Sequence, residues 1–184
     1  MERLIERVKS ILLIPEAEWL VVAQEPDDTA ALFTRYVAVL ALIPALAGFI
    51  GISVIAGRGS LAAGFIGAAV GYLLSFAAVF LVALIVDAVA PTFGVQKNFP
   101  SALKLTVYSY TPAWLAGIFL LIPGLSVLTF IGLYGGYLLW RGLPPLMHAP
   151  RGKTLPYAAA VVLCALIIEL LIGAVQFTMF GRTR

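Results

Sequence analysis

Four long stretches of this chain carry almost no charge. Residues 36–57, 59–86 and 105–140 contain no Asp, Glu, Lys or Arg, and residues 154–181 contain only one such residue, Glu169. A helix needs about 20 largely apolar residues to cross the hydrocarbon core of a bilayer. Each stretch is therefore long enough to span a membrane.

The overall composition excludes a soluble globular fold. The 184 residues are 62% hydrophobic and 11% charged, whereas a soluble domain is about 45–50% apolar and about 25% charged. A soluble fold of this size would have to build its surface from the uncharged stretches. We therefore predict an all-α fold, a polytopic membrane helix bundle. The net charge of +3 does not indicate nucleic acid, because the basic residues lie at segment ends rather than in a patch.

The uncharged stretches predict five transmembrane helices. The stretch 105–140 is too long for one span, since 36 residues would extend about 54 Å against a core of about 30 Å. Pro123 and Gly124 divide it near its centre and predict a tight turn. The expected spans are residues 36–56, 61–90, 101–122, 125–140 and 155–180.

Residues 1–34 are expected to be a cytoplasmic unit outside the membrane domain, which covers residues 35–184. Residues 1–14 alternate apolar and charged positions at helical spacing and predict a short amphipathic interfacial helix. The same charges leave no uninterrupted apolar region for a signal peptide. Pro15 ends this helix, and Trp19 predicts an interfacial anchor on a second one. The alternative is that both helices pack on the protein's own cytoplasmic face.

The distribution of basic residues predicts the orientation in the membrane. With the N-terminus in the cytoplasm, nine Lys and Arg residues lie inside and three outside, and the bias is still six to three without the first three. The outside residues are Arg58, Arg182 and Arg184, and the inside residues are Arg3, Arg7, Lys9, Arg35, Lys97, Lys104, Arg141, Arg151 and Lys153. The C-terminus is then expected on the periplasmic side.

Small residues recur at every fourth position of the second span. They are Ala63, Gly67, Gly71 and Ser75. Such a row lets another helix approach closely, which favours helix association in lipid. It predicts a helix-packing surface, and self-association into a homo-oligomer is one use of it.

Glu169 is the strongest candidate for a functional group. Ionisable residues inside a membrane usually face the bundle interior and often mark ion or proton pathways. Gln176 follows seven residues later and places a second polar group on the same helical face. Two interpretations remain open: a proton or cation site, and a protonated carboxyl that is hydrogen-bonded to another helix.

A polar stretch inside the third span is the second candidate site. It consists of Tyr108, Ser109, Tyr110, Thr111 and Pro112. Proline removes one amide donor and is expected to kink the helix here. Discontinuous helices mark substrate sites in some transporters, but a kink that only shapes helix packing is the commoner case.

Other chemistry-bearing residues give weaker signals. Asp87 lies near the cytoplasmic end of the second span, where an ion pair with Lys97 or Lys104 is favoured over a transport role. Cys164 is the one cysteine and is expected to be a packing residue. His148 has no acidic or cysteine neighbour, so we expect no metal. The sequence shows no nucleophile–base pair and no phosphate-binding loop, so we expect neither an enzyme nor a cofactor.

Several motifs resemble those of one membrane-protein family. The chain reads Tyr-Ser-Tyr-Thr-Pro at residues 108–112, Ile-Pro-Gly at 122–124, and Gly-Leu-Tyr-Gly-Gly-Tyr-Leu-Leu-Trp-Arg-Gly-Leu-Pro at 132–144. Together with residues 15–19, the Ile-Pro pair at 43–44 and an acidic residue in the last span, these resemble the YIP (Ypt/Rab-interacting protein) family, and specifically its short bacterial inner-membrane members.

The resemblance implies five spans, a cytoplasmic N-terminus and the bacterial inner membrane. Its eukaryotic members imply roles in membrane trafficking and binding of small GTPases, but the Asp-Leu-Tyr-Gly-Pro type motif of those members does not occur here. Two functional hypotheses follow. The first is a non-enzymatic protein that organises lipid or partner membrane proteins, and the second is a small transporter or channel that uses Glu169.

Overall fold

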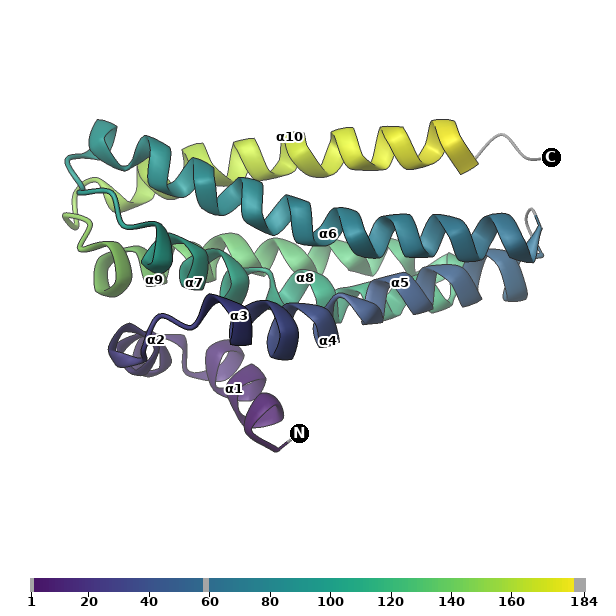
Figure 1. Ribbon diagram of the computed structural model, residues 1–184, viewed down its shortest axis with the longest axis horizontal. Coiled ribbons are helices and arrows are strands. Elements are labelled where there is room, and N and C mark those ends of the chain that lie inside the picture. The colour runs from purple at the N-terminus through teal and green to yellow at the C-terminus, as the bar shows by residue number, and fades with distance from the viewer. Residues whose placement is uncertain (1, 58–59, 181–184) are drawn as a thin grey trace.

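The computed structural model describes residues 2–57 and 60–180, and over these residues every regular element is a helix (Figure 1). The prediction of an all-α fold is confirmed. The helices, with η for 3-10 and π helices, are α1 Glu2–Leu13, α2 Pro15–Gln24, α3 Thr29–Ala31, η1 Leu32–Val37, α4 Ala38–Leu40, α5 Leu42–Phe49, η2 Ile50–Ile55, α6 Leu61–Val89, η3 Ala90–Phe93, α7 Phe99–Ser109, α8 Thr111–Ala116, η4 Gly117–Leu121, η5 Pro123–Leu133, α9 Tyr134–Met147 and α10 Thr154–Phe180.

Four helical segments are long and apolar enough to cross a membrane within the part of the chain that the structure describes. They are Thr29–Ile55, Leu61–Phe93, Pro123–Met147 and Thr154–Met179. They correspond to four of the five predicted spans. Part of the predicted turn at residues 57–60, and Arg58, Arg182 and Arg184 from the charge bias, lie outside the described residues.

The remaining predicted span, residues 101–122, is a broken helix at the centre of the bundle. It consists of α7, α8 and η4, and every residue from Ala102 to Ser109 is buried. Among these, Lys104, Thr106 and Ser109 are polar. Because this helix is surrounded by protein rather than lipid, it can carry polar side chains that a lipid-facing span cannot.

Two predicted boundaries are wrong. The fourth span was expected to end at residue 140, but α9 continues to Met147 through two internal prolines. Arg141, expected in a loop, is helical because its guanidinium pairs with Glu16 of α2 and lies over the Trp140 ring, 5.5 Å from its centroid. The first span begins earlier than expected, at Thr29, because the carboxylate of Asp28 caps that helix end.

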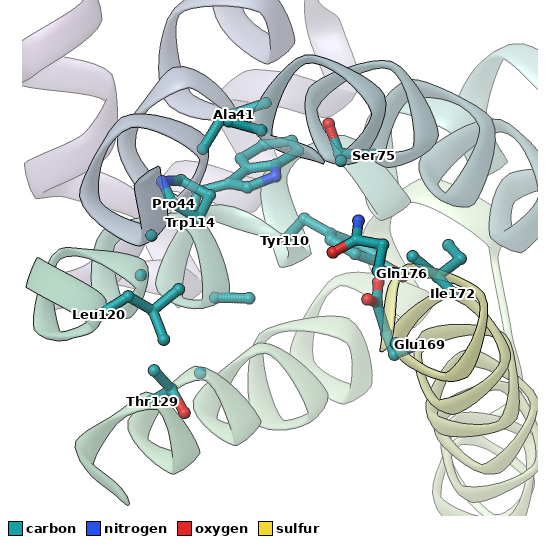
Figure 2. Close-up of a pocket in the computed structure, with 18 of the residues that line it drawn as sticks. Ala41, Pro44, Ser75, Tyr110, Trp114, Leu120, Thr129, Glu169, Ile172 and Gln176 are labelled. Atoms are coloured by element: carbon teal, nitrogen blue, oxygen red, sulfur yellow. The ribbon is translucent and has the colours of Figure 1, made fainter. Parts of the chain in front are cut away.

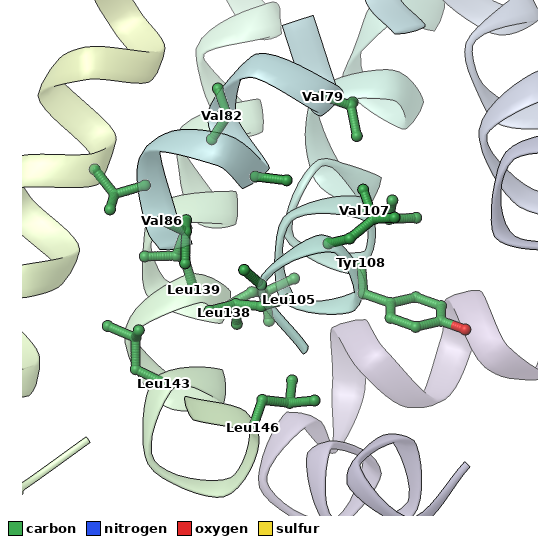
Figure 3. Packing of buried hydrophobic residues seen from close by; sticks show 14 of the residues in the cluster. Val79, Val82, Val86, Leu105, Val107, Tyr108, Leu138, Leu139, Leu143 and Leu146 are labelled. Carbon is green, nitrogen blue, oxygen red and sulfur yellow. The ribbon is translucent and has the colours of Figure 1, made fainter. Parts of the chain in front are cut away.

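A continuous hydrophobic core fills one half of the bundle (Figure 3). It is formed where α6, α7 and α9 meet. The side chains in its centre are almost completely buried and include Val79, Val82, Val86, Leu105, Leu138 and Leu143. The interior of this half, where α6, α7 and α9 meet, is therefore closely packed.

The helices α1 and α2, which we name the N-terminal cap, pack against the same half of the bundle. Trp19 has no exposed surface and meets the Tyr108 ring edge-on, with 6.3 Å between ring centroids. The close approach depends on Gly142, where an added Cβ would lie 2.7 Å from the indole. The prediction that Trp19 anchors the chain at the membrane interface is therefore wrong. Instead α2 packs on the protein's own surface, as the alternative stated.

Charged side chains fasten the cap to the bundle. Arg7 of α1 forms ion pairs with Glu18 of α2 and with Glu25 just after α2, and its guanidinium lies over the Tyr108 ring of α7, 5.7 Å from the ring centroid. Lys104 of α7 is buried and bonds to Asp27 at 2.6 Å and to the Glu25 carbonyl oxygen at 2.5 Å. These contacts neutralise the buried cations, which makes their burial tolerable.

Candidate functional site

A cavity of about 880 Å³ lies beyond the hydrophobic core, in the other half of the bundle (Figure 2). Helices from all five chain segments contribute to its walls. It extends from Ser60 and Phe130 at one end to Val82 and Val161, where the core begins. Ligand sites in proteins usually have volumes of about 300–1,000 Å³. The cavity therefore has the size of a binding site for a substantial molecule.

The predicted row of small residues on α6 faces this cavity. Ala63, Gly67, Gly71 and Ser75 all line it. The row also brings α10 close, because a Cβ added to Gly71 would lie 2.7 Å from the amide nitrogen of Gln176. Close packing within one chain is thus one use of the row, and its use in self-association remains a prediction.

Polar side chains gather on one side of the cavity and form what we name the carboxyl site: Ser109, Tyr110, Glu169 and Gln176. In Figure 2 Tyr110, Glu169 and Gln176 lie together where α10 faces the α7–α8 break. The Glu169 side chain is exposed to the cavity, whereas Ser109 is only 5% exposed. Among the described residues, the buried hydroxyl of Ser109 has no hydrogen-bond partner, and the buried hydroxyl of Tyr110 has the Glu169 carboxyl beside it.

The break in the third span lies where Pro112 predicted it. The helix α7 ends at Ser109 and α8 begins at Thr111, so Tyr110 is the hinge between them. Ser109 and Tyr110 line the cavity at this break, whereas Thr111 does not.

The other residues of the predicted polar stretch do not line the cavity. Tyr108 packs under the N-terminal cap, and its ring is 4.8 Å from that of Tyr36. The Thr111 hydroxyl is 2.8 Å from the Tyr36 hydroxyl in a buried hydrogen bond. Pro112 is buried. The structure therefore divides the stretch between a packing role and the carboxyl site.

Comparison with known proteins identifies the family. The Yip1 domain matches residues 9–172, which include α2, the end of α1 and three residues of the carboxyl site, Ser109, Tyr110 and Glu169. The chain belongs to the Yip1 family. Inner membrane protein YohC from Escherichia coli K12 is 24% identical over 179 residues, covering 91% of this chain and 92% of that protein. YohC from E. coli O6:H1 strain CFT073 matches equally. No solved structure matches the chain.

Asp87 of this Yip1-family protein lies outside the cavity. Its predicted ion pair with Lys97 or Lys104 is not found among the described residues, because Lys104 binds Asp27 instead. One carboxyl oxygen of Asp87 is buried without a hydrogen-bond partner. Asp87 is therefore separate from the carboxyl site.

Trp114 of the cavity wall was not predicted as a site residue. It lines the cavity beside Tyr110, with 5.7 Å between the ring centroids, and is 3% exposed. The tryptophan has no distinguishing sequence signal, because an aromatic residue in an apolar helix is as well suited to packing as to binding.

Proposed function

We propose that this Yip1-family protein is a non-enzymatic inner-membrane protein that binds a membrane lipid or a similar amphiphile in its cavity. The observation that carries the proposal is the cavity itself, about 880 Å³ in volume and lined mainly by apolar side chains. A site with such walls holds hydrocarbon more readily than a hydrophilic solute.

The walls near α10 support entry from the lipid phase. The second half of α10 and the helix η5 both line the cavity, yet their side chains are largely exposed, with Leu170 73%, Phe177 69% and Phe130 69% exposed. In a membrane these surfaces contact acyl chains. Hydrocarbon is therefore the molecule at the highest local concentration beside the cavity.

The proposal places the chain in the membrane with five passes. The four long apolar segments are then joined by the shielded helix formed by α7, α8 and η4. The N-terminal cap lies in the cytoplasm and the C-terminus in the periplasm, as the distribution of Lys and Arg favours. The E. coli relatives, which are named inner membrane proteins, support this location.

Filling the cavity tests lipid binding directly. Protein purified in mild detergent is expected to retain bound lipid in native mass spectrometry. Gly67→Leu combined with Gly71→Leu places two large side chains on the cavity wall and is expected to abolish retention. Gly124→Leu is the matched control, because a Cβ at this position meets no atom within 4 Å. Equal retention by wild type and the double variant would contradict the proposal.

A second candidate function is transport that uses Glu169. The observation in its favour is that the cavity reaches this carboxyl from one end of the bundle. In proteoliposomes it predicts a pH- or ion-dependent flux that Glu169→Gln abolishes. A flux that is unchanged in this variant would remove Glu169 from the mechanism.

A further inference from the structure

The charge of the cavity walls limits what the cavity can bind. Among the described residues that line it, Glu169 is the only one with a carboxyl or a cationic side chain. A lipid phosphate would find no Lys or Arg there, although such side chains are the usual phosphate ligands. An anionic head group is therefore disfavoured inside this cavity.

The cations of the cap region are not available to Glu169. Arg7, Lys104 and Arg141 are all engaged in ion pairs with acidic residues of the N-terminal region. None of the three lines the cavity. A carboxylate in an apolar environment is stable only when a proton or a cation neutralises it. Among the described residues, no cationic side chain on the cavity wall can neutralise Glu169.

The groups next to Glu169 suit an ammonium ion. Ammonium ions bind to the faces of tryptophan and tyrosine rings, and a nearby carboxylate adds electrostatic attraction. Tyr110 and Trp114 supply two neighbouring rings on the cavity wall. The Ser109 hydroxyl, which has no partner among the described residues, and the Tyr110 hydroxyl, which lies beside Glu169, both have acceptor lone pairs for the N–H groups of such an ion.

We propose that the ligand is a long-chain amphiphile with a protonated amine as its head group. The ammonium ion binds Glu169 with Tyr110 and Trp114 beside it, and the hydrocarbon chain lies along the apolar walls toward Phe130. This inference rests on the proposed function and adds the chemical class of the ligand.

The test compares two ligands of equal chain length, octadecylamine and 1-octadecanol. Binding of each to the full chain in nonionic detergent is measured by native mass spectrometry at neutral pH, where a primary amine is protonated. Wild type is expected to bind the amine about tenfold more tightly than the alcohol. Glu169→Gln is expected to reduce this ratio to about one, because only the charge changes.

Two further variants make the result specific. Glu169→Asp keeps the charge and is expected to retain a preference for the amine. Asp87→Asn removes a carboxyl that lies outside the cavity, and it is expected to leave the ratio at the wild-type value. Together they separate a role of the Glu169 charge from a general effect of losing a carboxyl.

The other outcomes overturn the proposal in different ways. Equal binding of amine and alcohol to wild type would refute the ammonium ligand and leave lipid binding intact. A preference that persists in Glu169→Gln would show that Glu169 is not the binding group. If wild type binds neither ligand and also retains no lipid, the proposed function itself fails.

Discussion

The two halves of the bundle differ in packing. In the half covered by the N-terminal cap, Trp19 and Tyr157 have no exposed surface, and regular α-helices meet in a closed core. In the other half, η5 contains no buried residue, and the cavity separates it from α10. The same apolar composition thus produces a closed core in one half and an open cavity in the other.

Irregular helices occur in both halves. The π helix η2 and the 3-10 helices η4 and η5 lie in the cavity half, while η1 and η3 contribute Tyr36, Val37 and Ala90 to the hydrophobic core. Packing rather than helix type therefore distinguishes the two halves. We predict that the capped half contributes most of the stability and that the cavity half contains the proposed binding site.

The largest expected loss of stability comes from a substitution in the half covered by the N-terminal cap. Trp19→Ala removes a fully buried aromatic side chain and is expected to lower the free energy of unfolding by about 3–5 kcal/mol. Phe130→Ala, on the cavity half, removes a side chain that is 69% exposed and is expected to change it by less than about 1 kcal/mol. Equilibrium unfolding by SDS in mixed micelles measures both, and equal losses would contradict the division.

The ion pairs of the cap predict the next effect. Arg7→Ala leaves Glu18 and Glu25 without their cation, and Arg7 and Glu18 are only 19% and 15% exposed. We expect a loss of about 1.5–3 kcal/mol in the free energy of unfolding. Arg3→Ala changes an exposed residue of the same helix and is expected to have little effect in the same SDS titration. A neutral Arg7→Ala would show that the ion pairs of Arg7 do not contribute to the stability of the cap.

A substitution in the carboxyl site is expected to raise the free energy of unfolding rather than lower it. Glu169→Leu replaces a carboxyl in an apolar cavity and is expected to raise the free energy of unfolding by about 0.5–2 kcal/mol. The measurement is again SDS unfolding, without added ligand. A marked loss of stability would instead support the structural interpretation, in which the carboxyl is hydrogen-bonded to another helix.

The smallest expected difference in stability is between two tyrosine-to-phenylalanine variants, one in each half of the bundle. The Tyr36 hydroxyl is hydrogen-bonded to Thr111, so Tyr36→Phe is expected to lower the free energy of unfolding by about 0.5–1.5 kcal/mol. The Tyr110 hydroxyl lies beside the Glu169 carboxyl but makes no hydrogen bond of normal geometry among the described residues, so Tyr110→Phe is expected to lower the stability by less than Tyr36→Phe does. Similar losses in both variants would mean that Tyr110 has a bonding partner in the folded protein.

Local features of the fold were predictable from the sequence. The long uncharged stretches located four of the apolar helical segments, because length and hydropathy decide whether a helix can span a membrane. Pro112 located the break at Tyr110, because a proline affects the helix within its own turn. Helical spacing also grouped Glu169 with Gln176 on one face.

Contacts between distant segments were not predictable. The sequence placed Trp19 at the interface because tryptophan suits both that environment and a buried one. The pairing of Arg7 with Glu18 depends on how α2 folds back, which no local pattern specifies. The close contact of Gly71 with Gln176 likewise follows from the packing of α6 against α10. Whether the carboxyl site binds a ligand remains a prediction.

The burial of α7 has a consequence for relatives of this chain. A hydropathy scan recognises lipid-facing helices, and it passes over a helix whose surroundings are protein. Counting only the four apolar segments gives an even number of crossings and assigns both chain ends to the same compartment. Adding α7 makes the number of crossings odd. The segments after α7 then lie on the opposite side of the membrane from the side that four crossings would give. The location of a reporter fused to the C-terminus therefore shows whether this buried helix crosses the membrane.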